Sequence, residues 1–271
     1  MAARPSTTRP ADPKVLTAEL RRSHQISPHL RRVTLGGPGL ADFRPLGHDQ
    51  WFRFFFPREG QQTLALPTRT NALWYAQFLM TPKDRRPWVR NYTVRHYRPG
   101  DDPELDIDFV THDDHAGPGA RFAAEAPIGT TVGILDQGLI YQPDRPETHR
   151  LLVGDESALP AIAGIVASLP ADARGDVFLE LPCLDDVQEL AAPEGVRVNW
   201  LFRHDDPDRV PGRLALEAVT TAAPPTTPPY VFIAGEQGLV TELRRHLVER
   251  SVPKSSISFT GYWRHGRAAP G

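Results

Sequence analysis

The segment 90–95 places three kinds of chemistry within a few neighbouring residues. It reads Arg-Asn-Tyr-Thr-Val-Arg and is typical of a β-strand, in which alternate side chains point to opposite faces, so Arg90, Tyr92 and Val94 would share one face. A guanidinium offers a planar fork for phosphate, a tyrosine ring offers an aromatic surface, and the Thr93 hydroxyl can donate to a ring nitrogen. This combination suits a phosphorylated aromatic cofactor. Taken alone, the segment also fits an ordinary surface strand with scattered charges.

A second candidate site follows the strand-like run that ends at Asp108-Phe109-Val110. The chain continues through His112 to Gly117-Pro118 and then into the helix-like run 119–124. A helix that begins after such a loop has free backbone N–H groups in its first turn, and these groups bind phosphate. The alternatives are a plain Gly-Pro turn and, for a lone histidine, a satisfied polar residue.

Composition describes an ordinary globular chain. Its 271 residues are 40% hydrophobic and 24% charged with a formal net charge of -2, which leaves room for two cores and gives no electrostatic case for nucleic acid or membrane binding. The apolar runs are far shorter than the ~20 residues of a membrane span, and no apolar signal core begins the chain. We therefore expect a cytoplasmic monomer without stable membrane association.

Metal and cysteine chemistry are not indicated. The single cysteine, Cys183, excludes an internal disulfide and a cysteine-ligated cluster, and its apolar neighbours favour a buried small side chain. No group of His, Asp and Glu has the spacing of metal ligands, so we expect no metal site. A redox role would then require an organic cofactor.

The pattern along the chain predicts two domains after a tail at residues 1–13. In the first domain, residues 14–145, short β-branched or aromatic runs are separated by Gly, Pro and Asp, as in an antiparallel barrel or sandwich. We expect strands at 15–22, 30–35, 50–56, 92–97, 105–110 and 131–135, with 72–80 as a connecting excursion and not a core strand.

In the second domain, residues 146–271, strands alternate with helices, which predicts a parallel α/β sheet covered on both faces. We expect strands at 151–154, 177–181, 196–202, 230–234 and 257–262, and helices at 159–169, 214–222 and 239–250. Ligands of such sheets bind beyond the carboxyl ends of the strands, where Asp155-Glu156-Ser157, Arg203 and Gly235-Glu236 would surround one crevice. No Gly-x-Gly-x-x-Gly motif supports nucleotide binding here.

A barrel with Arg-x-Tyr-Thr and a Gly-rich loop, followed by a parallel α/β domain, resembles the ferredoxin-NADP reductase superfamily. More closely, the chain resembles the siderophore-interacting proteins, or ferric-siderophore reductases. The residues that carry the resemblance are 90–95, 106–112, Gly117-Pro118, 120–123, 152–162, Trp200-Leu201, Arg203, 234–236, 261–264 and Gly266.

The resemblance implies that the first domain binds FAD and the second NAD(P)H. Arg90 and Thr93 are then expected at the flavin phosphate and ring nitrogen, and Tyr92 against the ring. The expected contacts to the pyrophosphate and adenosine end are Asp108, Phe109, Val110, His112, Gly117, Ala120 and Arg121. The nicotinamide-nucleotide crevice would be lined by Asp155, Glu156, Ser157, Gly235 and Glu236, with Arg203 at the adenosine ribose or its 2′-phosphate. Trp263 is expected close to the flavin, so the reactive ring would meet Thr93, Tyr92 and Trp263.

The implied activity passes electrons from NADH or NADPH through FAD to a ferric siderophore, releasing Fe(II) in the cytoplasm. The loop departs from the usual Gly-Pro-Ala-Ser-Arg-Trp of the family at Gly119, Ala120 and Phe122, and we still expect the flavin to be retained because backbone amides form much of a phosphate site. Candidates for the siderophore rim are Arg85, Arg86, Arg264, His265 and Arg267, with solvated surface charges as the alternative. The rival functions are another flavin electron-transfer protein of the superfamily and a non-enzymatic siderophore-binding protein.

Overall fold

The structure is a computed structural model that describes residues 7–61, 63–71, 73–111, 117–143, 149–203, 206, 208–223, 225 and 227–267. It divides into two compact units. We call them the barrel unit, which comprises residues 9–46 and 50–138, and the α/β unit, which comprises the described residues from 139 onward together with 7–8 and 47–49. Within the stretch expected as a tail, Thr8 pairs with Leu139 through two backbone hydrogen bonds of 3.0 and 2.9 Å.

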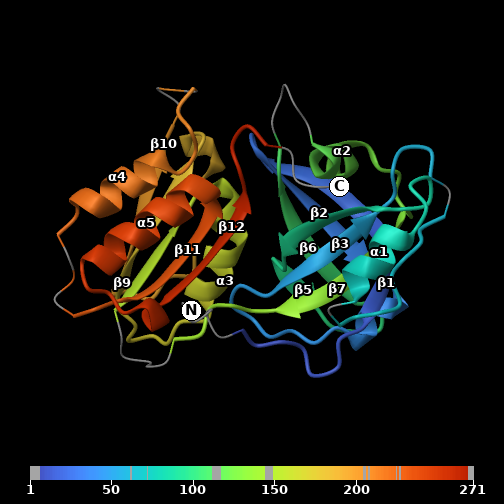
Figure 1. Ribbon diagram of the computed structural model, residues 1–271, viewed down its shortest axis with the longest axis horizontal. Coiled ribbons are helices and arrows are strands. Elements are labelled where there is room, and N and C mark those ends of the chain that lie inside the picture. Colours follow the sequence, from blue (N-terminus) through green and yellow to red (C-terminus); the bar gives the residue numbers. More distant parts are fainter. Residues whose placement is uncertain are drawn as a thin grey trace. The chain divides into compact units, whose positions relative to one another are not determined.

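The barrel unit is built on a seven-stranded antiparallel sheet, as the sequence predicted (Figure 1). Its strand order is β4-β3-β7-β1-β2-β6-β5. The strands are β1 (Val15–Ser27), β2 (Leu30–Gly36), β3 (Trp51–Phe56), β4 (Trp88–Thr93), β5 (His96–Arg98), β6 (Glu104–Val110) and β7 (Thr131–Gly138).

The sheet closes where the sequence predicted one strand over 92–97. The structure has two shorter strands instead, because the chain changes partner at this point: β4 pairs with β3, and β5 pairs with β6. The change is visible in consecutive amides, since Val94 N–H donates to Gln50 at 2.8 Å and Arg95 N–H donates to Asp106 at 2.9 Å. The run 88–98 therefore bridges the two ends of the sheet and makes it a barrel.

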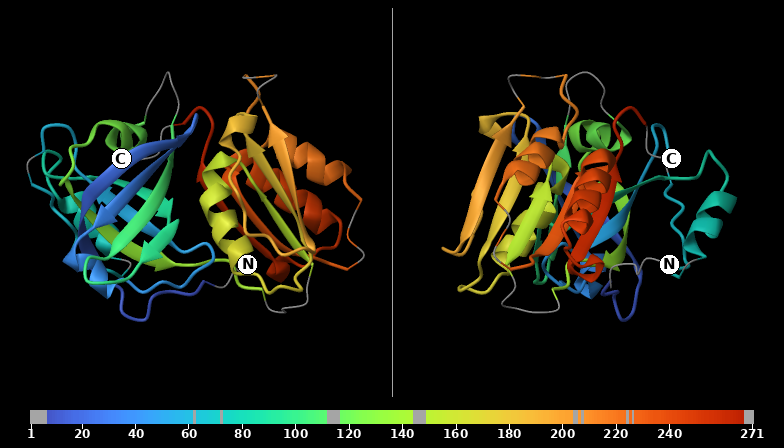
Figure 2. Two further views of the ribbon diagram at one scale, coloured as in Figure 1. Left: turned by 180° about the vertical axis from the view of Figure 1, so that it is seen from behind. Right: turned by 60° about the vertical axis from the view of Figure 1, so that its left-hand side comes forward.

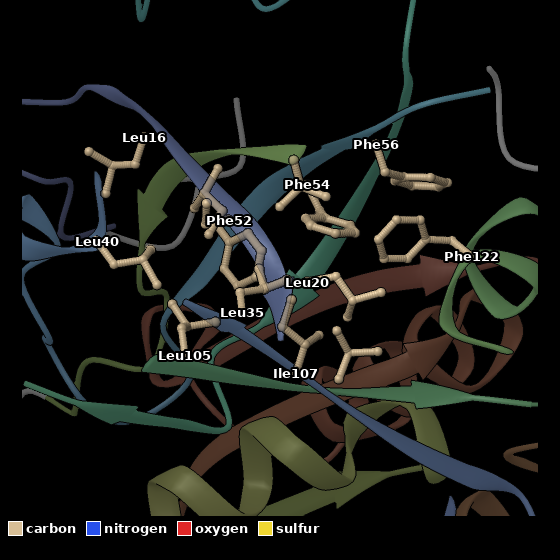
Figure 3. Close-up of a cluster of buried hydrophobic side chains, with 14 of the residues drawn as sticks. Leu16, Leu20, Leu35, Leu40, Phe52, Phe54, Phe56, Leu105, Ile107 and Phe122 are labelled. Atoms are coloured by element: carbon tan, nitrogen blue, oxygen red, sulfur yellow. The ribbon is translucent and has the colours of Figure 1, made fainter. Parts of the chain in front are cut away.

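The barrel core is rich in phenylalanine (Figure 3). Phe52, Phe54 and Phe56 alternate along β3 and point inward, where the Phe54 and Phe56 rings lie 5.3 Å apart between centroids. Tyr92 of β4 packs against the same cluster, so the face that it was predicted to share with Arg90 is the inner face of the barrel.

Two helices and a 3-10 turn flank this sheet. Helix α1 (Trp74–Met80) occupies the stretch expected to be a connecting excursion, and helix α2 (Pro118–Glu125) follows the Gly-Pro loop as predicted. The 3-10 turn η1 is Pro38–Asp42. Phe122 and Ala123 of α2 enter the barrel core, whereas Trp74 and Phe78 of α1 join a smaller cluster with Phe55 and Leu135.

The α/β unit contains a five-stranded parallel sheet, which confirms the predicted alternation of strands and helices (Figure 1). The strand order is β10-β9-β8-β11-β12. Its elements are β8 (Arg150–Gly154), α3 (Leu159–Ala167), β9 (Gly175–Leu181), β10 (Val196–Phe202), α4 (Arg213–Thr221), β11 (Tyr230–Glu236), α5 (Gln237–Glu249) and β12 (Ile257–Trp263), with 3-10 turns η2 (Glu156–Ala158), η3 (Leu184–Asp186) and η4 (Lys254–Ser256).

Helices cover both faces of this sheet. Ala215 and Val219 of α4 join Leu239 and Leu243 of α5 in one apolar cluster with alternate residues of the strands, and both helices lie on the same face in Figure 1. On the other face α3 lies close to β8, because a Cβ atom at Gly154 would meet the Ile162 Cδ1 of α3 at 3.1 Å. Among the described residues, no helix has the length and apolar character needed to cross a bilayer.

The strand order of the parallel sheet reverses direction between β8 and β11, which are direct neighbours. At such a switch point the connections that leave adjacent strands run to opposite faces, and a crevice opens at the carboxyl ends of the strands. The loops that follow β8 and β11 are those predicted to line the nucleotide site.

Candidate functional site

In the barrel unit, Arg90 and Tyr92 project from β4 opposite Phe54 and Phe52 of β3. The Arg90 guanidinium carbon lies 5.3 Å from the centroid of the Trp88 ring, and its Nη1 donates to the Val89 carbonyl at 2.7 Å. These contacts hold the guanidinium at the strand instead of leaving it to sample solvent.

The Tyr92 ring packs 4.2 Å from the Phe109 ring, centroid to centroid, and its hydroxyl lies against Gly119. A Cβ atom at Gly119 would come within 2.1 Å of the Tyr92 Oη, so the glycine is required for this placement of the tyrosine. Burial raises the pKa of Tyr92 well above the ordinary value of a tyrosine, which keeps the hydroxyl protonated. Thr93 is only 8% exposed and its backbone pairs with Trp51.

The start of α2 offers backbone donors. Gly117 is the N-cap, Pro118 occupies the first turn, and no side chain caps the helix. The first amide with an intrahelical bond is that of Arg121, which donates to the Gly117 carbonyl at 3.0 Å, so the Gly119 and Ala120 amides are left for another acceptor. A Cβ at Gly117 would meet nothing within 4 Å, so the helix start is open.

Other residues predicted for the adenosine end have structural contacts. Phe109 lies in the core, and Val110 ends β6 opposite Leu30. Asp108 accepts two hydrogen bonds from Arg32, at 2.7 and 2.9 Å. His112 lies outside the described residues.

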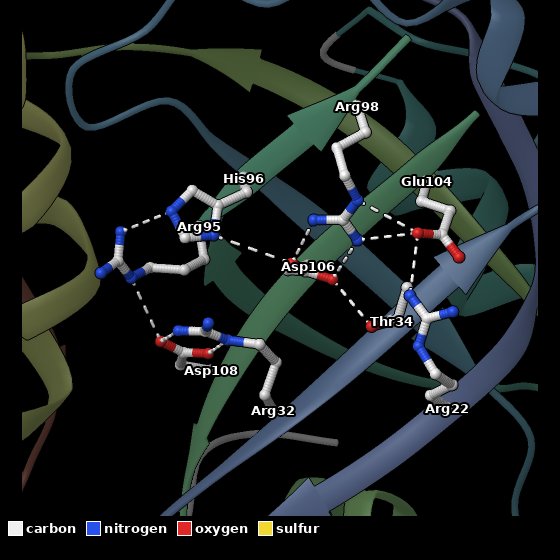
Figure 4. A network of polar contacts seen from close by, with 9 residues as sticks. All are labelled: Arg22, Arg32, Thr34, Arg95, His96, Arg98, Glu104, Asp106 and Asp108. Carbon is white, nitrogen blue, oxygen red and sulfur yellow. Dashed lines mark hydrogen bonds and ion pairs between the residues drawn. The ribbon is translucent and has the colours of Figure 1, made fainter. Parts of the chain in front are cut away.

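The Arg32–Asp108 pair belongs to a larger network on β1, β2, β5 and β6 (Figure 4). Arg98 contacts Asp106 at 2.6 and 2.8 Å, and Thr34 donates to the same carboxylate at 2.7 Å. Burial, the largest single influence, raises the pKa of Asp106, but the hydrogen bonds from Arg98 and Thr34 and the charges of Arg98 and Arg32 together hold this pKa below its usual range. The remaining ion pairs of this barrel network join Arg95 to Asp108, Arg98 to Glu104 and Arg22 to Glu104. His96 Nδ1 lies 3.7 Å from Asp106, and burial lowers the pKa of this imidazole.

In the α/β unit, the turn after β8 and the end of β11 are joined at Asp155. One carboxylate oxygen accepts from the backbone amide and the hydroxyl of Ser157, at 2.9 and 2.5 Å. The other accepts from the Glu236 amide at 2.6 Å and from the indole nitrogen of Trp263 at 3.1 Å. Burial, and secondarily the neighbouring Glu156 carboxylate, raise the pKa of Asp155 to about 7. One side chain therefore ties together three of the predicted site segments.

The strand end at Gly235 approaches this carboxylate closely. Gly235 has a φ of 125°, and a Cβ atom there would lie 2.6 Å from Asp155 Oδ2. Glu236 forms the N-cap of α5 by accepting from the Gly238 and Leu239 amides, and its other oxygen accepts from the His265 amide at 3.1 Å. Both carboxylates thus bind the chain itself.

Arg203, predicted to lie at the nucleotide ribose, forms ion pairs within the α/β unit. Its guanidinium is 8% exposed and contacts Glu156 at 2.9 Å through each of two nitrogens and Glu180 at 3.1 Å. A contact to the nucleotide stays a prediction, but the geometry gives Arg203 a positioning role under the turn after β8.

Sequence reasoning missed Glu180, which is fully buried in β9. Besides Arg203, it accepts from the Gly212 amide at 2.9 Å and the Ala215 amide at 3.0 Å, and so anchors the start of α4. A charged residue inside the apolar run 177–181 was the available signal, because a buried carboxylate requires partners.

A cavity of about 540 Å³ lies at the amino ends of the parallel strands, opposite to their carboxyl ends. Its walls include Asp176 and Arg197 near the starts of β9 and β10, and His149 just before β8. Leu247 of α5 and Arg250, just after that helix, also line it. The carboxyl-end crevice predicted for the nucleotide is therefore a separate place in the same unit.

An antiparallel barrel with an uncapped helix start, followed by a parallel sheet with a switch point, defines the class of ferredoxin-reductase-like proteins. Family models agree: residues 19–139 match the siderophore-interacting FAD-binding domain and residues 147–266 match siderophore-interacting protein. The chain therefore belongs to the siderophore-interacting protein family.

Individual relatives support the same assignment. The chain is 32% identical over 250 residues to the ferric vibriobactin reductase ViuB of Vibrio cholerae, covering 91% of this chain and 88% of ViuB. The structure of the siderophore-interacting protein SipS from Aeromonas hydrophila matches with a TM-score of 0.73 and 34% identity, covering 93% of this chain and 99% of SipS. A siderophore utilization protein from T. fusca matches with a TM-score of 0.79 and 31% identity, covering 97% of both chains.

Proposed function

We propose that the protein is a cytoplasmic NAD(P)H-dependent flavoenzyme that reduces ferric siderophores and releases Fe(II). The observation that carries the proposal is the siderophore-interacting FAD-binding domain at residues 19–139, supported by the likeness to a ferric vibriobactin reductase. The barrel supplies donors that suit an anionic cofactor, since the α2 start has two unengaged amides and no side-chain cap.

In this proposal the barrel unit holds FAD. Arg90 contributes positive charge for a phosphate, Thr93 a hydroxyl for a ring nitrogen, and the Gly119 and Ala120 amides bind the pyrophosphate. When bound, a flavin accepts two electrons as hydride and returns them singly, so one NAD(P)H can reduce two ferric ions. The α/β unit binds NAD(P)H at the carboxyl ends of β8 and β11.

The carboxyl-end residues have a supporting role in this proposal. Asp155 and Glu236 fix the backbone of the two loops, so the nucleotide would meet mainly backbone groups and the Ser157 turn. Reduction releases iron because hard oxygen donors bind Fe(III) more strongly than Fe(II), and no protein metal ligand is required. We propose that the enzyme acts as a monomer.

The decisive experiment follows NAD(P)H oxidation by the purified protein with a ferric siderophore, while a ferrous chelator traps the product. The expected result is a flavin absorption spectrum and two Fe(II) trapped for each NAD(P)H oxidised. The gallium(III) complex of the same siderophore is the matched control, because Ga(III) is not reduced under these conditions and should give no stimulation.

Three other outcomes would each reject the proposal. A protein without flavin that binds the siderophore would be a non-enzymatic binding protein. A flavoprotein whose NAD(P)H oxidation ignores ferric siderophores but responds to a protein acceptor or free flavin would be another reductase of the superfamily. Equal stimulation by the iron and gallium complexes would indicate binding without iron reduction.

A further inference from the structure

Helix α1 carries an apolar surface that no described part of the barrel unit covers. Leu73, Tyr75, Leu79 and Met80, which we call the α1 patch, are 49%, 46%, 45% and 78% exposed. The other large exposed hydrophobic side chains among the described residues are Ile128, Leu184 and Val187, far from α1 in the sequence. Single exposed hydrophobic residues are common, but a group of neighbouring ones marks an interaction surface.

The opposite side of α1 is apolar as well. Trp74 and Phe78 are buried, and the Trp74 ring lies 6.0 Å from the Phe55 ring between centroids. The Arg53 guanidinium also lies over Trp74 at 4.3 Å. Except at Gln77, α1 is apolar on both sides, and the barrel unit covers only the side that carries Trp74 and Phe78.

The polar side chains near α1 brace the helix and do not shield the patch. Gln77 accepts from the Thr68 and Arg69 amides at 3.1 and 3.0 Å, and its amide group donates to the Thr68 hydroxyl at 3.0 Å. Arg86 donates to the carbonyls of Leu79 and Thr81 at the end of the helix. The outward orientation of the α1 patch is therefore fixed by contacts with the segments on either side of the helix.

The sequence around α1 has an excess of positive charge. Residues 57–88 contain five cations, Arg58, Arg69, Lys83, Arg85 and Arg86, and two anions, Glu59 and Asp84, which gives +3 in a chain whose net charge is -2. Arg69, Lys83 and Arg85 are exposed and form no ion pair with another described residue. Unneutralised cations beside an apolar patch complement a surface that is both anionic and apolar.

We propose that the α1 patch docks the protein reversibly on an anionic lipid bilayer. Leu79, Met80 and Tyr75 enter the boundary between headgroups and acyl chains, while Arg69 and Lys83 contact anionic headgroups. The right-hand view of Figure 2 shows α1 standing out from the strands of its own unit. One short helix with few cations gives weak binding that salt can reverse.

The test is co-sedimentation of the full-length holoprotein with sucrose-loaded vesicles at low ionic strength. One set of vesicles is pure phosphatidylcholine and the other contains 30 mol% phosphatidylglycerol. The wild type should bind the phosphatidylglycerol vesicles and be released by added salt. Leu79→Ser combined with Met80→Ser should lower the partition coefficient about tenfold or more, because the inserted apolar area is lost.

A charge-reversal variant tests the second half of the proposal. Arg69→Glu combined with Lys83→Glu should reduce binding by at least fivefold for each cation lost. Two matched controls should bind as the wild type does. Ile128→Ser removes an exposed apolar side chain elsewhere in the barrel unit, and Arg245→Glu with Arg250→Glu makes the same charge change in the last turns of α5 and at its C-cap. Met80→Ser alone serves if the double serine variant does not fold.

The proposal would be overturned by absence of binding to phosphatidylglycerol vesicles, by equal losses in the controls, or by equal binding to both kinds of vesicle. It would also be overturned if sedimentation equilibrium showed a dimer that Leu79→Ser with Met80→Ser abolishes. A second copy of the chain would then cover the patch.

Discussion

The barrel unit and the α/β unit each contain a network of ion pairs. The two networks differ in which sign of charge is in excess and in how exposed the cationic side chains are. In the barrel network, Arg22, Arg32, Arg95 and Arg98 face Glu104, Asp106 and Asp108, and the Arg22 and Arg98 side chains are 56% and 44% exposed. In the α/β unit, the single cation Arg203 faces Glu156 and Glu180, and all three side chains are at most 8% exposed.

This difference separates two roles for charge. An ion pair whose cation is exposed, such as Arg22 with Glu104 or Arg98 with Glu104, adds little to stability. A buried network tolerates no loss, since removal of one partner leaves an unpaired charge away from water. The carboxyl end of the parallel sheet is therefore a place where charged side chains hold backbone, whereas the barrel keeps arginines near its surface.

Removal of the lone cation should give the largest effect. Arg203→Ala would leave Glu156 and Glu180 buried without a counter-charge, and we expect a loss of about 3–5 kcal/mol in the free energy of unfolding. Arg22→Ala in the barrel network is the matched control, because the Arg22 and Glu104 side chains are 56% and 21% exposed, and it should cost at most about 1 kcal/mol. Urea unfolding of both variants measures the contrast. Equal losses would erase the distinction between the two networks.

Removal of a barrel cation should instead affect cofactor retention. Arg90→Ala is expected to weaken flavin binding by about 1.5–3 kcal/mol, the usual range for a charge-assisted hydrogen bond to phosphate. Flavin content per folded protein after gel filtration measures it, with Arg98→Ala as the control for a general loss of positive charge. Unchanged flavin content in Arg90→Ala would remove this residue from the site.

The glycine beneath Tyr92 tests whether the helix start and the strand act together. In Gly119→Ala the new Cβ would lie 2.1 Å from the Tyr92 Oη, so the tyrosine would have to move. We expect the free energy of unfolding to fall by about 1–3 kcal/mol, as is typical of overpacking, and the flavin content to change. Gly117→Ala is the control, because its Cβ meets nothing within 4 Å. If the two variants behaved alike, the Tyr92 position would be unimportant.

The sequence predicted most of the architecture because its signals are local. Alternating apolar residues in 105–110 and the Ala/Ile-rich run at 159–169 correspond to β6 and α3 within a few residues. The break between β4 and β5 was not visible, since it depends on a change of hydrogen-bond partner between strands distant in sequence.

The site was harder to predict than the fold. The sequence predicted that Asp155 and Glu236 lie around one crevice, and the structure joins them through a hydrogen bond; the bond from Trp263 to Asp155 was not predicted. The sequence did not reveal that Arg203 binds Glu180, because that contact joins the ends of two strands. Phe122 stands where the family usually has Trp, and the structure accounts for this difference: the Phe122 ring packs in the barrel core, 5.3 Å from the Phe54 ring between centroids.

The buried acids of the α/β unit should make its stability fall as pH rises. Burial raises the pKa of Asp155 to about 7 and that of Asp49 to about 6, so the folded state retains protons that the unfolded chain releases near pH 4. Stability contributed by the neutral forms is then complete below pH 4 and is lost up to about pH 7, with a slope of about 1.4 kcal/mol per pH unit for one proton. Unfolding by urea between pH 4 and 8 measures this slope.

In Asp155→Asn the stability should no longer fall between pH 6 and 7. In Asp49→Asn the stability should still fall between pH 6 and 7 but should fall less steeply between pH 4 and 6. A wild type whose stability rises over the same interval would show that the four donors around Asp155 outweigh its burial. The comparison between units would then change, because the carboxylate would behave like the acids of the barrel network.

The smallest effect is expected at Trp263, and it is the most specific test of the α/β network. Trp263→Phe keeps a smaller aromatic ring and removes the indole N–H that donates to Asp155 at 3.1 Å, and Trp200→Phe makes the same change in ring size. Because a hydrogen bond to a charged carboxylate is stronger than one to a neutral acid, the variant should lose about 1 kcal/mol of stability at pH 8 and less at pH 5. Its Asp155 should also titrate at a higher pH than in the wild type, since a donor that favours the charged form is gone.

Trp200→Phe, on β10, is the matched control and should show no such pH dependence. A Trp263→Phe loss that is constant across pH would mean that the ring acts by packing alone, while brighter flavin fluorescence in the same variant would support the predicted contact with the cofactor.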